Sequence, residues 1–130
     1  MKNYPFQLVD DDSVIVLIAF IENRFRLRLA LDTAASHTTI DSNVLFMLGY
    51  ELKDAIGEVE VETSNGIILV EEHRIAKLAC LDIERMDFVI QVYDFLAHGV
   101  TSDYDGVLGL DFLRNQKICL DFKRFIISVH

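Results

Sequence analysis

The chain has 130 residues and a formal net charge of −9 at pH 7, with 21 Asp and Glu against 12 Lys and Arg. This acidic balance repels extended anionic partners, so we do not expect nucleic acid as a ligand. Hydrophobic residues make up 52% of the sequence, which indicates a folded globular protein. The length suits one domain over residues 1–130.

The N-terminal region predicts neither export nor membrane insertion. Residues 1–7 lack the long apolar segment of a secretory signal, and three aspartates follow at 10–12. The longest apolar run, Val14 to Ile21, is too short for a bilayer-spanning helix, which takes roughly 20 residues. We therefore expect a cytoplasmic protein that does not bind membranes.

Short apolar or alternating runs predict strands along most of the chain. These runs are residues 13–22, 24–31, 58–62, 67–73, 88–93, 117–122 and 125–129. Their lengths and turn-like separations favour an all-β barrel. Helix is expected in two short places. Residues 41–49 have polar cap candidates before an apolar stretch that ends in Gly49, and residues 111–115 form the second.

One stretch presents a carboxylate at the end of a predicted strand. Asp32 follows the apolar residues 29–31 and is trailed by the small residues 33–36, which would let a second backbone approach it closely. This position suits a catalytic aspartate. An Asp followed by Thr is also an ordinary strand-ending turn, because both side chains bond to nearby backbone N–H groups.

Two further motifs follow Asp32 in order. Residues 59–70 alternate apolar and acidic side chains, reach Asn65-Gly66 and resume with apolar residues, which predicts a β-hairpin. Residues 106–109 read Gly-Val-Leu-Gly and precede the second short helix. They are also consistent with an ordinary buried strand.

Together these motifs resemble the retroviral-type, or retropepsin-like, aspartic proteases over roughly residues 20–129. That family carries two hydrophobic residues before Asp-Thr/Ser-Gly, then a flap hairpin, then two hydrophobic residues and Gly before a short helix. The tip at residues 63–66 looks like that of single-domain bacterial relatives. The resemblance implies a closed acid-protease-type β-barrel with a flap hairpin and an endopeptidase of extended polypeptides.

The sequence departs from the family at Ala34, where the family has Gly. The added methyl group can crowd the close approach of two active-site turns, because glycine permits contacts that a Cβ hinders. Alanine is the smallest alternative to glycine, so the site stays plausible.

The resemblance also implies a homodimer, because a complete site needs two carboxylates and the chain has one Asp-Thr-Ala motif. The two Asp32 side chains would share one proton, since like charges about 3 Å apart cannot both ionise easily. One would activate water while the other hydrogen-bonds the scissile carbonyl. This chemistry needs no metal and no cofactor.

The resemblance assigns roles to the neighbours of Asp32. Thr33 and Ala34 would support the active site, with the Thr33 hydroxyl bonding across the dimer. Residues 107–109 would pack beneath the active-site turn. Substrate contacts are expected from Ala35, Ser36, Ser64, Asn65 and Gly66.

Other ionisable residues favour structural roles. Asp105 precedes a glycine and reads as a turn residue rather than a second catalytic carboxylate within the chain. The aspartates at 10–12 suit a solvated loop better than a calcium site. His37 could lie near the cleft, although a surface or packing role is favoured. The four histidines are too scattered for zinc, and Cys80 and Cys119 are expected as reduced core thiols.

Two alternatives remain open at this stage. A catalytically silent member of the same fold would bind peptides or serve dimerisation, and Ala34 is the feature in its favour. An unrelated small β-barrel would instead bind an apolar ligand and could work as a monomer.

Overall fold

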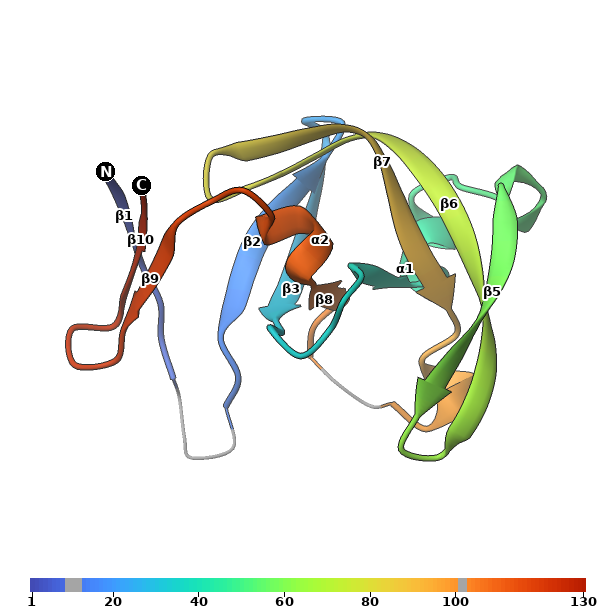
Figure 1. Ribbon diagram of the computed structural model, residues 1–130. Helices are drawn as coiled ribbons and strands as arrows, with labels where there is room; N and C mark the ends of the chain where they lie inside the picture. The colour runs from blue at the N-terminus through green and yellow to red at the C-terminus, as the bar shows by residue number, and fades with distance from the viewer. Residues whose placement is uncertain (9–12, 101–102) are drawn as a thin grey trace.

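The computed structural model of the chain describes residues 1–8, 13–100 and 103–130 (Figure 1). The loop expected at residues 10–12 lies outside this part. Strands dominate the described residues, which also contain the short helices α1 (Ser42–Met47) and α2 (Leu110–Leu113). Single 3-10 turns, η1 and η2, occupy Leu52–Asp54 and Leu96–His98. Within the described ranges, no helix is long and apolar enough to cross a membrane.

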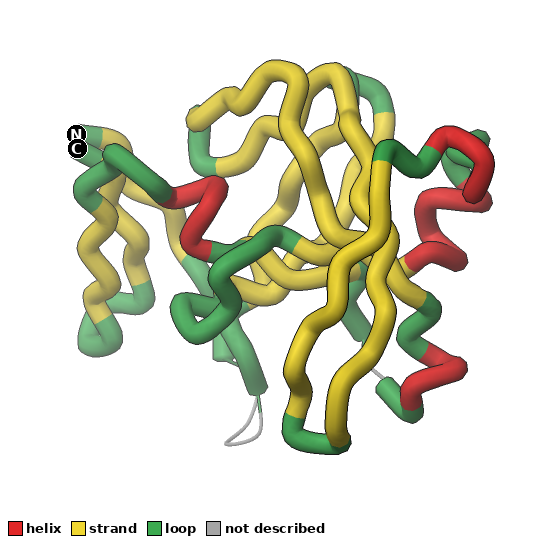
Figure 2. The backbone as a smooth tube through the Cα atoms, turned by 45° about the vertical axis from the view of Figure 1, so that its right-hand side comes forward, coloured by secondary structure: helices red, strands yellow, loops and turns green. Residues whose placement is uncertain are grey.

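Six strands close into a barrel, as Figure 2 shows. Each strand pairs with the next, and β2 also pairs with β6, which completes the ring. The predicted all-β barrel is therefore confirmed. The order is β2 (Val16–Ile21), β3 (Phe25–Leu31), β8 (Gly106–Leu108), β4 (Thr39–Asp41), β7 (Ile83–Tyr93) and β6 (Gly66–Cys80).

The flap hairpin extends from the barrel wall. Strand β5 (Gly57–Thr63) pairs antiparallel with the first half of β6, from Gly57↔Glu72 to Thr63↔Gly66. The hairpin is where the sequence predicted it. Thr63 pairs with Gly66, so the turn residues are Ser64 and Asn65 rather than Asn65 and Gly66. The Thr63 hydroxyl donates to the Gly66 carbonyl and accepts the Asn65 N–H. Gly66 follows at φ +113°, which favours glycine.

A three-stranded sheet holds both chain ends. It has the order β1 (Lys2–Pro5), β10 (Ile126–Val129) and β9 (Ile118–Asp121), and the termini lie side by side in Figure 1. Strand β1 was not predicted, because Lys-Asn-Tyr-Pro has no apolar alternation. Pro5 is tolerated there because β1 is an edge strand of this sheet.

The core follows from strand alternation. Leu17, Ala19 and Ile21 of β2 are buried, while Ile18 and Phe20 between them are exposed. Phe112 of α2 and Ile127 of β10 are fully buried in the same core, so the helix and the terminal sheet are fixed to the barrel.

The two cysteines differ in environment. Cys80 is buried as expected, and burial raises the pKa of its thiol to about 12. The same expectation is wrong for Cys119, which is exposed. It lies opposite Ser128 on the outward face of the terminal sheet, where alternation along β9 directs it away from the core.

Strands β6 and β7 are longer than predicted, because the turn that joins them lacks a sequence signal. Leu81 and Asp82 form this turn with φ values of +55° and +59°. Two-residue turns of this conformation usually contain Asn or Gly. A hairpin built on Leu-Asp is therefore not visible to a search for turn residues.

Gly106 provides a test of barrel closure at β8. A Cβ at Gly106 would lie 2.2 Å from the Thr39 carbonyl oxygen and 2.9 Å from the Ile40 Cα atom. We expect Gly106→Ala to lower the free energy of unfolding by about 1–3 kcal/mol or more, because backbone atoms must move. The control Gly57→Ala meets one side-chain oxygen at 3.6 Å and should change it little. Equal urea midpoints for the two variants would contradict this packing.

Candidate active site

Asp32 lies at the end of β3, on a turn that its own side chain stabilises. Its backbone N–H donates to the Leu108 carbonyl at 3.1 Å, which continues the β3–β8 pairing by one residue. Its Oδ1 atom accepts the Ala34 N–H at 2.9 Å, and its carbonyl accepts the Ala35 N–H at 3.1 Å. The side chain is partly exposed. A carboxylate is thus held in a defined place at the protein surface.

Residues 35–37 of the same loop rest on the start of α2. Leu110 donates its N–H to the Ala35 carbonyl at 2.8 Å, and Asp111 donates to the Ser36 carbonyl at 3.2 Å. Gly109 makes this contact possible, because a Cβ there would lie 2.6 Å from the His37 carbonyl carbon. The Gly-Val-Leu-Gly motif therefore lies directly against the Asp32 loop.

A buried threonine and an aspartate lock the loop to the helix. Thr38 is 0% exposed, and its hydroxyl donates to Asp111 Oδ1 at 2.7 Å while it accepts the Gly109 N–H at 3.1 Å. The Thr38 and Phe112 N–H groups donate to the same Oδ1 atom, at 2.9 and 2.8 Å. One carboxylate oxygen thus receives three hydrogen bonds. Sequence reasoning missed this pair, since its members are 73 residues apart.

Arg85 fixes the other end of α2. Its Nε and Nη2 atoms donate to the Phe112 carbonyl at 2.9 and 2.7 Å, and Nη2 also donates to the Arg114 carbonyl. These carbonyls at the helix end have no partner within the helix, and a cation suits this terminus. Both ends of the helix beneath the Asp32 loop are therefore anchored by side chains.

Thr33 and Ala34, which are expected to support the active site, lie exposed in the turn. Ala34 does not adopt a positive φ, so its backbone conformation does not require glycine. Its side chain is exposed in the single chain. Among the described residues, the Thr33 hydroxyl has no hydrogen-bond partner. It is free to bond to another chain.

The expected substrate-binding residues fall into two groups. Ala35 and Ser36 belong to the Asp32 loop, where the Ser36 hydroxyl lies 2.8 Å from His37 Nδ1. Residues 64–66 form the flap tip, and both groups extend toward the same end of the barrel (Figures 1 and 2). Among the described residues, no hydrogen bond joins the two groups.

Asp105 has a structural role, as its turn context favoured. Its Oδ2 atom accepts the Arg28 N–H at 2.8 Å, and its own N–H donates to the Arg28 carbonyl at 2.7 Å. Its carbonyl accepts the Asp41 N–H at 2.9 Å. Asp105 therefore bridges β3 and β4. Among the described residues, no group of three or more His, Cys, Asp or Glu could hold a metal ion.

Comparisons with known proteins identify the family and the fold. The family model described as aspartyl protease matches residues 19–112, and the chain belongs to this family. The crystal structure of a retropepsin-like aspartic protease from Rickettsia conorii is similar, with a TM-score of 0.71 and 18% sequence identity. The match covers 98% of this chain and 99% of that one, which shows the same fold. A search of curated proteins finds no match. The alternative hypothesis of an unrelated small β-barrel that binds an apolar ligand is therefore wrong.

The Thr38 network predicts a specific loss of stability. Thr38→Val keeps the volume but leaves the Gly109 N–H unpaired, so we expect the free energy of unfolding to fall by about 1–3 kcal/mol. The matched control is Thr39→Val, since Thr39 is also buried but makes one long hydrogen bond of 3.4 Å, to the His37 carbonyl. Urea denaturation measures both variants. A control that loses as much stability as Thr38→Val would argue against the network.

Proposed function

We propose that this chain is an aspartic endopeptidase that hydrolyses extended polypeptides as a homodimer. The observation that carries the proposal is the placement of Asp32, whose partly exposed carboxylate lies on a loop tied to both β8 and α2. Membership of the aspartyl protease family supports it. The sequence holds one Asp-Thr-Ala motif, so the second carboxylate would come from another copy.

In the proposed mechanism the two Asp32 carboxylates hold one proton and one water between them. The ionised carboxylate removes a proton from the water as the water oxygen attacks the scissile carbonyl carbon. The protonated carboxyl group donates a hydrogen bond to the carbonyl oxygen. The proton taken from water then passes to the amide nitrogen as the C–N bond breaks. Each Thr33 hydroxyl would bond to the facing loop and hold the pair in place.

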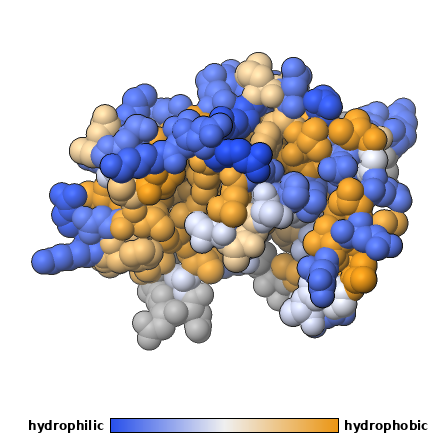
Figure 3. Space-filling view, in the orientation of Figure 1, coloured by the Kyte–Doolittle hydropathy of each residue, from blue (hydrophilic) through white to orange (hydrophobic). Residues whose placement is uncertain are grey.

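Exposed apolar side chains on α2 and the terminal sheet support a second copy. Leu110, which is bonded through its N–H to this loop, is 45% exposed. Leu120 of the terminal sheet and Phe122, which follows the same strand, are also exposed, and Figure 3 shows apolar surface on the face of the molecule that Figure 1 presents. Exposed apolar side chains lose contact with water when a partner covers them. Dimer formation would cover them.

The flap hairpin is suited to cover an extended peptide. Val59 lies opposite Val70, and Val61 lies opposite Ile68. These four side chains therefore face one side of the hairpin. In this proposal Ser64, Asn65 and Gly66 close over substrate backbone bound along Ala35 and Ser36. Backbone hydrogen bonds and apolar pockets then provide the affinity.

The cytoplasmic location expected from the sequence stays a prediction.

The decisive test of the chemistry is Asp32→Asn. With a mixture of unstructured peptides between about pH 4 and 7, we expect site-specific cleavage by the natural sequence and a loss of roughly 10²–10⁴-fold in the variant. At low protein concentration the rate should rise faster than linearly, because two copies form each site. A folded protein with no Asp32-dependent cleavage would instead be the catalytically silent peptide-binding member.

Ala34 tests the dimer. Because this side chain is exposed in the single chain, Ala34→Val should leave the unfolding of the monomer unchanged. We expect it to reduce cleavage by roughly tenfold or more, equivalent to about 1.4 kcal/mol or more of lost association. The control Ala76→Val places the same exposed change on β6. Full activity in Ala34→Val would contradict close packing of two turns.

A further inference from the structure

Neighbouring strands of the barrel carry a row of polar side chains on one face. Residues directly opposite each other on paired strands project to the same face of a sheet. Thr39 of β4 lies opposite Gln91 of β7, and Gln91 lies opposite Glu72 of β6. Thr39 also lies opposite Val107 of β8, which pairs with Ala30 of β3. The row therefore crosses five strands, and its three polar members are adjacent.

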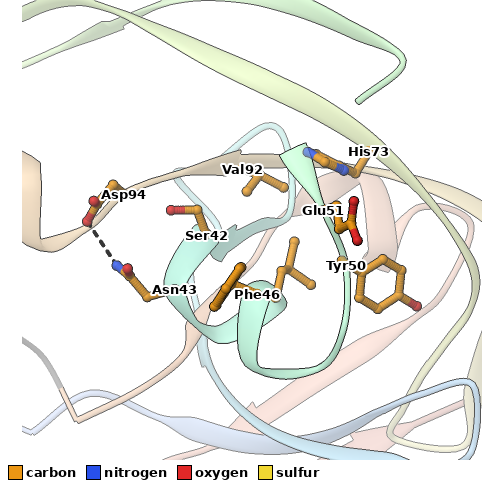
Figure 4. A pocket seen from close by; sticks show the side chains of 9 residues that line it. Ser42, Asn43, Phe46, Tyr50, Glu51, His73, Val92 and Asp94 are labelled. Atoms are coloured by element: carbon orange, nitrogen blue, oxygen red, sulfur yellow. Dashed lines mark hydrogen bonds between the residues drawn. The ribbon is translucent and has the colours of Figure 1, made fainter. Parts of the chain in front are cut away.

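This row points away from the barrel core. Ile90 and Val92, which flank Gln91 in β7, are buried in the core, so alternation directs Gln91 outward. A cavity of about 230 Å³ lies on the other side of these strands, next to α1 (Figure 4). Val92 and His73 line that cavity, and neither Gln91 nor Glu72 does. The row and the cavity are therefore on opposite faces of β6 and β7.

The row continues the apolar side of the flap hairpin. Along β6, Val70 and Glu72 project to the same face, because successive side chains alternate. Val70 lies opposite Val59 of β5 and is 1% exposed, whereas Leu69 on the other side of the hairpin is 58% exposed. An extended peptide held under the flap would thus pass from apolar side chains to Glu72 and Gln91.

Gln91 brings an unpaired amide group to this face. The residue is 9% exposed, and among the described residues its side chain makes no hydrogen bond. In that part of the chain, the one side-chain nitrogen or oxygen that is fully enclosed without a partner is His73 Nδ1. The Gln91 amide therefore keeps contact with the surface. A largely buried amide without a partner costs free energy that a bound polar group can recover.

Glu72 adds a negative charge next to this amide. Its side chain is half-buried, and its Oε1 atom lies over β5, 3.6 Å from the position of a Cβ at Gly57. Within the described ranges, its carboxylate makes no hydrogen bond or ion pair. Arg74, the next residue on this face of β6, instead donates to the Asp87 carbonyl at 3.3 Å. The Glu72 carboxylate is thus available to a ligand.

We propose that Glu72 and Gln91 select substrates that carry Lys or Arg near the scissile bond. The cationic side chain donates to the Glu72 carboxylate and to the Gln91 carbonyl oxygen, and such charge-assisted hydrogen bonds are strong. A substrate carboxylate would meet the negative charge of Glu72, and an aliphatic side chain would leave the Gln91 amide unpaired. This inference rests on the proposed peptidase function and adds a substrate class to it.

Strand spacing sets the position of the basic residue in the substrate. Gln91 lies three strands from β3, which ends at Asp32, and this separation is about 14 Å at roughly 4.8 Å per strand. An extended substrate covers it in roughly four residues, and a long basic side chain shortens the distance. We therefore expect Lys or Arg two to four positions from the scissile bond. A two-fold dimer presents the same row on both sides of that bond.

The test measures binding and cleavage separately. A randomised decapeptide library is passed over immobilised Asp32→Asn protein, and the retained peptides are sequenced. We expect Lys and Arg to be enriched roughly threefold or more over the starting library. In cleavage by the natural sequence, kcat/KM should be roughly tenfold higher for a peptide with Arg at the selected position than for its norleucine counterpart.

Variants localise the selectivity. Glu72→Gln should remove most of the enrichment and bring the Arg-to-norleucine ratio of kcat/KM to within roughly twofold of one. The matched control Glu58→Gln removes the same charge from the exposed side of β5 and should leave both values unchanged. Gln91→Leu should favour norleucine. If this buried variant does not fold, the comparison of Glu72→Gln with Glu58→Gln decides.

The outcomes separate this inference from the proposed function. Asp32-dependent cleavage whose Arg preference is absent, or is changed equally by Glu72→Gln and Glu58→Gln, overturns the selectivity and leaves proteolysis supported. Retention of basic peptides that Glu72→Gln abolishes, without cleavage by the natural sequence, supports the selectivity and contradicts proteolysis. A folded protein that neither retains nor cleaves peptides contradicts both.

Discussion

The structure around Asp32 depends on the hydrogen bonds between Thr38 and Asp111. Where the chain leaves β3 and turns back into β4, its backbone groups lose their strand partners. Asp111 supplies one carboxylate oxygen to three donors at this point, and Gly109 lets the helix approach to backbone contact. Charge-assisted hydrogen bonds of this kind are roughly twice as strong as neutral ones. These hydrogen bonds hold the loop rigid and therefore fix the position of the Asp32 carboxylate.

The proposed chemistry needs a second carboxylate beside this rigid loop. A single carboxylate with its Oδ1 atom bonded to the Ala34 N–H can accept a proton, but acid and base roles together need a second group. Two loops held equally rigidly by their own helices could face each other without much rearrangement. Thr33 is exposed, and Ala34 does not have a positive φ. Both features are compatible with such a contact.

The sequence predicted those features that local chemistry determines. Asp32 after an apolar strand, the hairpin predicted over residues 59–70 and the glycines at 106 and 109 each carry a signal in a few consecutive residues. Partners far apart in the chain carry none, so the bond from Thr38 to Asp111 could not be predicted. The Leu81-Asp82 turn was missed because its residues are unusual for its conformation.

Environment was harder to predict than position. Cys119 has apolar neighbours in sequence, yet strand alternation turns it toward solvent, and no residue pattern fixes which face of a terminal sheet is covered. His73 illustrates the same limit. Its neighbours in sequence did not indicate that one ring nitrogen would be paired with Glu71 while the other is buried with no partner among the described residues.

The central claim, that two copies of Asp32 make one site, is tested most directly by mixing subunits. Natural protein and Asp32→Asn are combined at constant total concentration, above the dimer dissociation constant, and allowed to exchange before cleavage is measured. Since a mixed dimer has one ionisable carboxylate, activity should fall with the square of the natural fraction, to about one quarter in an equal mixture. A linear fall, to about one half, would mean that each chain acts alone and would contradict the account.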